Sequence, residues 1–161
     1  MPIFIQEAMN FFVGDNGADN SKHLILESLK LPTLEETGQD YIPGGAIGEI
    51  AVGGLGLKKL ECTFKIKGYD PQTMSQFGLG SRGRLPYTFY GAIRDKKGNR
   101  AIEVKVIMEG RLAKLEGDDL QRSELVGHDH MIHEIWHYEL YWDKREKYYY
   151  DFLASDWRVD G

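Results

Sequence analysis

The amino-acid sequence predicts a mainly β protein, a β-sandwich or open barrel with one short α-helix. Several segments alternate between apolar and polar residues with a period of two, the pattern of a strand that buries one face. Composition agrees, because nineteen glycines and nine tyrosines stand against five prolines in 161 residues, and aromatic residues favour strands. We expect a single domain over residues 1–161, large enough to bury a sizeable core.

The clearest strand is 60–66, where Leu60, Cys62, Phe64 and Ile66 alternate with polar residues. Strands in a regular succession with one helix are typical of a sandwich or barrel. The expected strands are 23–31, 60–66, 87–94, 101–115, 131–142 and 147–154. The remaining features are a short apolar run at 9–13, turns at 14–20, 95–99 and 143–146, and polar loops at 33–45 and 116–127.

One short helix is expected after the strand at 60–66. Asp70 has the character of an N-cap, Pro71 suits the first helical position, and Gly78 stands where the helix should end.

Charge and cysteine content exclude several classes of protein. The formal net charge of −5 argues against a nucleic-acid-binding surface, which normally needs a basic patch. Cys62 is the only cysteine, so no intramolecular disulfide can form, and its place on the apolar side of a strand indicates a core residue. The N-terminus lacks the basic segment of a signal peptide. No apolar run approaches the ~20 residues of a membrane span.

Six glycines fall within residues 41–57, a density that suggests a loop shaped around something. A phosphate loop is excluded, because Gly54 stands where that motif needs lysine. A dinucleotide fold is excluded too, because Lys59 replaces the third glycine of its fingerprint and a strand follows. We expect no cofactor.

Residues 133–137 read His-Glu-Ile-Trp-His, which matches the zinc-protease signature. That chemistry requires a helix, whereas Ile132, Trp136 and Tyr138 share the parity of a strand. In a strand His133 and His137 would lie about 13 Å apart, at ~3.3 Å per residue, too far to share one metal ion. We therefore expect neither a metal site nor catalytic residues. Tyr148–Tyr150 is consistent with a sugar-stacking patch, although such a run more often splits between a core face and an interface face.

Read in order, several segments resemble the major tail tube protein of contractile-tailed bacteriophages and related tailocins. No single segment is specific, but their order and spacing cover nearly the whole chain. They are 10–14, 26–34, 41–45, 54–57 leading into the strand with Phe64, 104–111 with the acidic loop that follows, 138–143 and 157–161. The chain departs from this pattern in a longer, more acidic turn at 15–22 and in ending soon after Asp160.

The resemblance implies a tail-tube-like subunit that forms hexameric rings stacked into a rigid inner tube. The implied partners are other copies of the chain, the sheath, tape-measure, baseplate and tail terminator proteins, and DNA that passes through the lumen without specific binding. The implied location is the virion tail after assembly in the cytoplasm of a host bacterium. An acidic subunit would suit a lumen that repels DNA phosphates.

Contacts between subunits or rings are expected in the loop 33–45 and the glycine-rich segment, because both have the composition of exposed chain between strands. The candidate residues are Thr33, Leu34, Glu35, Glu36, Asp40, Tyr41, Pro43, Gly44, Gly45, Gly48, Gly53 and Gly54. Three alternatives stay open: the secreted tube protein of a type VI-like system, a zinc-dependent hydrolase built on His133, Glu134 and His137, and a glycan-binding β-module.

Overall fold

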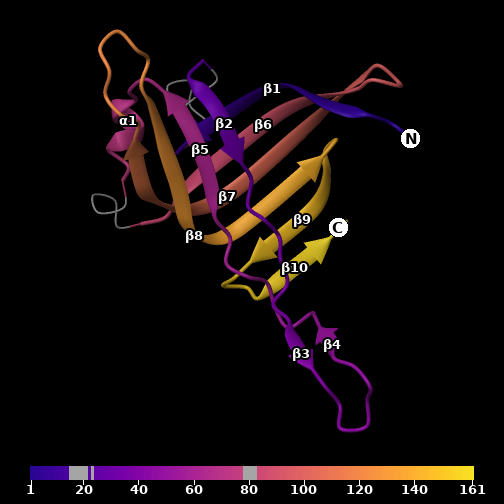
Figure 1. The fold of residues 1–161 in the computed structure, drawn as a ribbon. Coiled ribbons are helices and arrows are strands. Elements are labelled where there is room, and N and C mark those ends of the chain that lie inside the picture. Colours follow the sequence, from indigo (N-terminus) through magenta and orange to yellow (C-terminus); the bar gives the residue numbers. More distant parts are fainter. Residues whose placement is uncertain (15–21, 23, 78–82) are drawn as a thin grey trace.

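The computed structural model describes residues 1–14, 22, 24–77 and 83–161. Within these residues the chain is mainly β, with one short helix, as the sequence predicts (Figure 1). The elements are β1 Phe4–Val13, β2 Leu26–Lys30, β3 Gln39–Tyr41, β4 Ile50–Val52, β5 Cys62–Lys67, α1 Pro71–Met74, β6 Leu85–Asp95, β7 Arg100–Gly117, β8 Gly127–Trp142, β9 Arg145–Asp151 and β10 Asp156–Val159.

One eight-stranded sheet forms the body of the subunit. Its strands follow the order β1-β6-β7-β8-β5-β2, and β9 also pairs with β8 and carries β10. The sheet curls until its two ends face each other, since Phe11 on β1 contacts Phe64 on β5 with ring centroids 4.8 Å apart. The result is an open barrel rather than two separate sheets.

The core lies inside this curl and follows the predicted alternation. Cys62, Phe64 and Ile66 of β5 are buried, as are alternate residues of β7 from Ile102 to Met108. Burial raises the pKa of the Cys62 thiol to about 12, so this side chain is an inert core residue at neutral pH.

The helix is shorter than predicted. Asp70 is its N-cap and Pro71 its first residue, as expected, but α1 ends after one turn at Met74. Gly78 lies outside the described residues. The Asp70 carboxylate accepts a hydrogen bond from the Thr73 hydroxyl and forms an ion pair with the buried Lys22 ammonium at 2.8 Å, which ties the helix to the chain that follows β1.

Several strand boundaries differ from the prediction. The predicted loop 33–45 contains β3, and β10 forms where no strand is expected. β8 begins at Gly127, four residues before the predicted start, because His128 and His130 occupy buried positions of the alternation. Of the predicted turn at 14–20, only Gly14 is among the described residues, and His23, the first residue of a predicted strand, is not.

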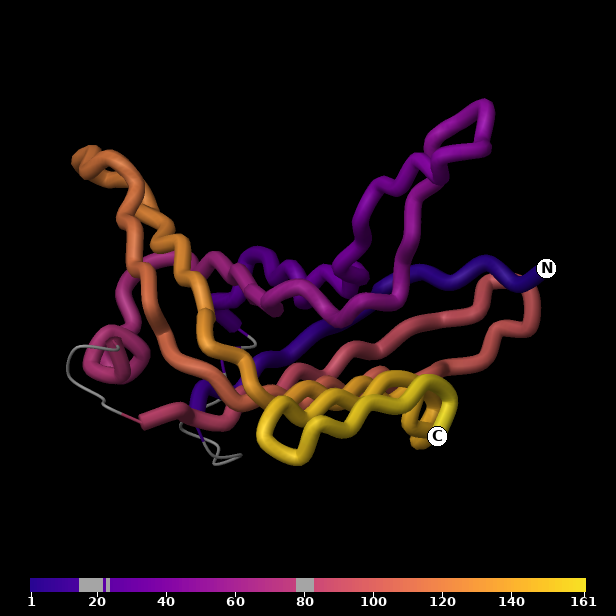
Figure 2. The backbone as a smooth tube through the Cα atoms, turned by 90° about the horizontal axis from the view of Figure 1, so that it is seen from below, coloured from indigo at the N-terminus to yellow at the C-terminus, as the bar shows by residue number. Residues whose placement is uncertain are grey.

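A β-bulge interrupts β8 where the histidine motif lies. On β7, Glu109 pairs with His137 and Arg111 with His133, so a two-residue step on β7 faces a four-residue step on β8. Glu134 accommodates the extra length in the left-handed conformation, with φ 53°. A bulge of this kind bends the strand and increases its twist, and β7 and β8 curve strongly along their length (Figure 2).

Because of the bulge, one core position differs from the prediction. Ile132 and Tyr138 are buried as expected, but Ile135 takes the place predicted for Trp136. Trp136 instead lies against the Arg84 guanidinium, 3.6 Å from the ring centroid.

Gly110 allows β7 to approach β8 at the bulge. A Cβ added there would lie 2.7 Å from Ile132 Cγ2 and 2.8 Å from the His133 carbonyl oxygen. Real Cβ atoms do not approach other heavy atoms so closely, and the carbonyl belongs to the backbone, so it cannot simply rotate away.

His130 is a buried titratable residue on β8. Its ring stacks on Phe64 with centroids 4.7 Å apart, and its Nδ1 lies 3.0 Å from the His128 carbonyl oxygen. Burial lowers the pKa of His130, and this effect outweighs the carboxylates of Asp70 and Asp129, which favour the charged form.

We predict that Gly110→Val destabilises the dilute, unassembled protein by roughly 1–3 kcal/mol, the usual cost of overpacking. Urea unfolding measures this. Gly45→Val is the matched control, because a Cβ at Gly45 meets nothing within 4 Å, and its stability should stay within about 0.5 kcal/mol. Equal stability of the two variants would contradict the structural account of Gly110.

We also predict that stability falls as the pH drops below the ordinary histidine pKa of 6.5. The folded pKa of His130 is lower than the unfolded one, so in this window the unfolded chain binds more protons. The contribution of neutral His130 to the free energy of unfolding is complete above this pH and is lost as the pH falls towards the folded pKa. Urea unfolding at a series of pH values should show a flatter profile for His130→Phe.

Candidate assembly surfaces

Residues 33–59 form a long projection, here called the arm, which leaves the barrel after β2 and returns to it at β5. Every residue of the arm is exposed except Pro43 and Leu57, which are half-buried. The arm extends well beyond the sheet (Figures 1 and 2). All twelve predicted contact residues lie on it, so the structure brings them together on one element.

The arm is an ordered hairpin and not the loop that the composition suggests. β3 pairs with β4, with Asp40 opposite Ala51. Nearer the barrel, Glu36 and Leu57 form an isolated bridge, and the Lys58 N–H donates to the Glu35 carbonyl oxygen at 2.8 Å. These backbone hydrogen bonds hold the two strands of the arm together.

Glycine has a conformational role at the base of the arm. Gly54 adopts the left-handed conformation with φ 75°, and its N–H donates to the Glu36 carboxylate at 3.1 Å. A residue with a side chain would be strained at this φ. Gly54 thus shapes the base of the arm, and no phosphate is needed to explain it.

The glycines at the tip are different. A Cβ added at Gly44, Gly45 or Gly48 would meet nothing within 4 Å, and none of the three has a left-handed φ. The isolated subunit therefore gives no packing reason for glycine at these positions. A surface that approaches the tip from outside would give one.

The arm carries a large amount of uncovered apolar surface. Exposed apolar patches of this extent usually mark interaction sites in a folded protein. The exposed apolar side chains are Leu34, Tyr41, Ile42, Ile47, Ile50, Val52 and Leu55.

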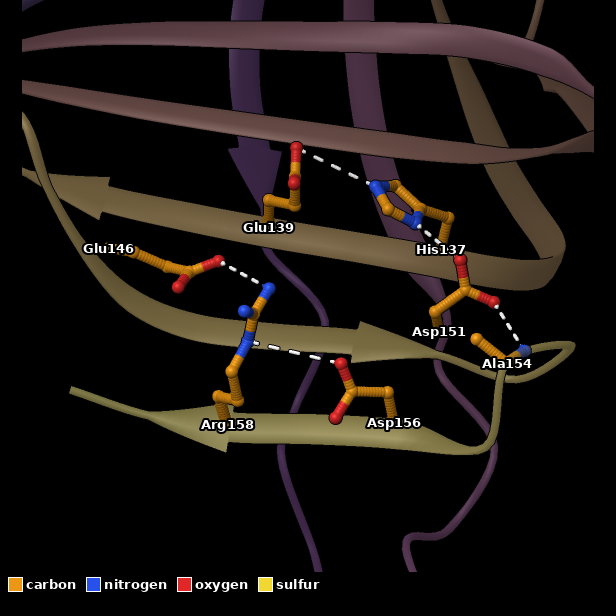
Figure 3. A network of polar contacts seen from close by, with 7 residues as sticks. All are labelled: His137, Glu139, Glu146, Asp151, Ala154, Asp156 and Arg158. Carbon is orange, nitrogen blue, oxygen red and sulfur yellow. Dashed lines mark hydrogen bonds and ion pairs between the residues drawn. The ribbon is translucent and has the colours of Figure 1, made fainter. Parts of the chain in front are cut away.

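A second surface lies on β8, β9 and β10, where polar side chains form a network (Figure 3). His137 Nδ1 lies 3.2 Å from Asp151 Oδ2 and its Nε2 lies 3.5 Å from Glu139 Oε2. Arg158 pairs with Glu146 at 3.3 Å. The N–H of Ala154 and the His137 ring both donate towards Asp151 and lower the pKa of that carboxyl.

The other side of β9 and β10 is apolar. Tyr150 packs against the core, whereas Tyr149 lies on the polar side under the Arg158 guanidinium. The tyrosine run therefore splits between a core face, as predicted, and a polar face. Trp157 and Val159 on β10 are largely exposed. Sequence reasoning missed β10 as a strand, although the polar–apolar alternation of 156–159 carried a short signal for it.

The histidine motif lies on the bulged strand β8, so the helix that a zinc-protease site requires is absent there. His133 Nε2 is 3.7 Å from the Glu61 carboxylate, while His137 contacts Asp151 on β9. The two rings thus have different partners. Among the described residues, no group of three or more His, Cys, Asp or Glu side chains could hold a metal ion.

Fold and surfaces together define a structural subunit, an open barrel with an ordered apolar arm. The family model for phage tail tube protein FII matches residues 8–161, so the chain belongs to that family. It is a structural subunit of a tail tube and a component of a tail particle, not an enzyme.

Two solved structures have a similar fold. A chain of the sheath–tube complex of PVC, an extracellular contractile injection system in its extended state, is 8% identical with a TM-score of 0.57, over 83% of this chain and 88% of that one. A chain of the anti-feeding prophage baseplate, 6-fold symmetrised, is 10% identical with a TM-score of 0.50, over 83% and 90%. Comparison with curated proteins found no match.

Among the described residues, no helix is long and apolar enough to cross a membrane.

We predict that zinc does not stabilise the purified protein, because His133 and His137 face different partners. A metal that binds only the folded state raises the unfolding midpoint, so thermal unfolding with and without zinc measures this. The midpoint should be the same in both, for the wild type and for His137→Ala. A zinc-dependent rise that His137→Ala abolishes would contradict the prediction.

Proposed function

We propose that copies of this chain form hexameric rings that stack into the rigid inner tube of a contractile tail. The arm carries the proposal: an ordered, apolar hairpin that the subunit itself leaves uncovered. The free outer edges of β1 and β10 add to it. Within the described residues β1 pairs only with β6 and β10 only with β9, and unpaired strand edges invite pairing with another chain.

Edges on different strands of one sheet, those of β1, β2 and β10, suit a heterologous contact. Such a contact uses a different surface on each copy, and it closes into a ring when the rotation between copies fits. The 6-fold symmetry of the anti-feeding prophage baseplate supports six as the number of copies. The arm then serves contacts between subunits or rings.

Partners outside the tube follow from the same assembly. The sheath–tube complex that contains a similar fold supports a sheath around this tube, and the baseplate structure supports a baseplate at its end. We further propose tape-measure and tail terminator proteins as partners and assembly in the cytoplasm of a host bacterium. DNA passes through the lumen without specific binding, for which a net charge of −5 is suitable.

The tip of the arm offers the test. Replacing Gly44 and Gly45 with tryptophan should leave the monomer folded, because both sites face open space, but should block tube formation by filling the space that a neighbouring copy needs. Negative-stain microscopy and sedimentation of concentrated protein measure assembly, and circular dichroism measures folding. The same double replacement with alanine is the control and should keep at least part of the assembly. Normal tubes from the tryptophan variant would refute the role of the tip.

A further inference from the structure

We propose that the core-side face of β9 and β10 is the docking surface for the arm of a second copy, so that subunits stack head to tail. This inference rests on the proposed tube assembly and names the partner of the arm. The docking strip consists of Tyr148, Trp157 and Val159.

Strand pairing places these three side chains on one face. Val159 pairs with Tyr148, and Trp157 pairs with Tyr150, whose ring packs against the core. Directly paired residues point to the same side of a sheet, while Arg158 belongs to the polar network on the other side (Figure 3). The strip therefore continues the core-side face of the sheet, but Trp157 remains 71% exposed and Val159 59% exposed.

The chemistry of the strip fits the arm. Tryptophan and tyrosine are the side chains that most often dominate the energy of a protein interface when an apolar partner covers them. The arm offers aliphatic partners at its tip and on β4, with Ile47 fully exposed and Ile50 54% exposed. Both surfaces are uncovered in the single subunit, and one contact between copies would cover both.

Charge is complementary as well. Between Glu36 and Leu57 the arm has three carboxylates, the others being those of Asp40 and Glu49, and neither lysine nor arginine. The turn between β8 and β9, beside the docking strip, carries Lys144 and Arg145 between Asp143 and Glu146. These two carboxylates already pair with Arg100 and Arg158.

Within the described residues, Lys144 and Arg145 form no ion pair of their own. Both cations are therefore available to carboxylates of an incoming arm. Such pairs steer association and fix its register more than they add affinity.

The arrangement of the two surfaces selects a head-to-tail contact. The arm rises from one side of the subunit, whereas β9 and β10 lie along the opposite side (Figure 2). About ten residues lead from Glu36 to the tip, which at ~3.3 Å per residue gives a reach of roughly 30 Å. An arm of that length reaches past its own barrel. A contact between two different surfaces, one on each copy, repeats from copy to copy and makes a filament when the rotation between copies does not close a ring.

Cross-linking between two singly substituted chains tests the contact. Cys62 is buried and gives little background. One chain carries Ile47→Cys at the arm tip, and the other, of different size through a tag, carries Val159→Cys. After mixing under assembly conditions, a short thiol cross-linker should give a heterodimer at least about fivefold more abundant than with Ala101→Cys, an exposed control on β7. This factor is an order-of-magnitude expectation for a specific contact over random encounter.

Sedimentation of the same mixtures separates the possible failures. Tubes that form without a preference for Val159→Cys over Ala101→Cys would overturn this docking surface and leave the proposed function intact. Chains that stay monomeric at high concentration would overturn the proposed function and this inference with it.

Charge exchange gives a second, independent readout. Lys144→Glu with Arg145→Glu should lower the amount of pelleted tube at least about tenfold, a factor that corresponds to about 1.4 kcal/mol. Asp40→Lys with Glu49→Lys in the same chain should restore it. The control Lys96→Glu with Lys97→Glu, in the exposed turn after β6, should assemble normally. Failure of the restoring pair to raise assembly would count against a contact between these charges.

Discussion

The close approach of β7 to β8 at Gly110 is the constraint on which the rest of the structure depends. Because Gly110 has no Cβ, β8 can bulge at Glu134 while it stays paired with β7 on both sides of the bulge. Before the bulge the free edge of β8 pairs with β5, and after it with β9. The bend thus lets a single strand belong to two parts of the sheet. One part closes the barrel through β5 and β2, and the other extends outward as β9 and β10.

This division explains why the subunit is stable and yet incomplete. The half that curls back buries Phe11, Phe64 and the apolar side of β7 in one core. In the half that extends outward, β9 packs Tyr150 against the core, but β10 lies at the outer edge, so Trp157 keeps most of its surface in water. Burial of apolar surface contributes about 25 cal/mol per Å², and the isolated chain gains only the smaller part of it at Trp157. A sequence that keeps large apolar side chains on an arm and on an outer strand is organised for contact with other chains.

The sequence alone predicted the parts of the fold that repeat a regular pattern. Leu60 to Ile66 and the apolar face of β7 alternate without interruption, so their strands and buried faces were predictable. The bulge was not, because it depends on Gly110 facing Ile132 from a distant strand. β3 and β4 were not predicted for a local reason. Each is only three residues long, which is too short to show an apolar–polar alternation among so many glycines.

Prediction of the candidate surfaces from the sequence has the same limit as prediction of the fold. Composition and the resemblance to tail tube proteins pointed to the arm, since exposed glycine-rich chain is visible in a sequence. The sequence suggested Tyr148–Tyr150 and Trp157 only for a glycan-binding module and did not predict β10 as an assembly surface, because only the topology shows that Trp157 and Val159 stay largely exposed. A contact between unlike surfaces requires both to be known. The arm alone leaves its partner undefined, whereas the proposed docking strip of Tyr148, Trp157 and Val159 gives the arm a partner on a second copy and the assembly a direction.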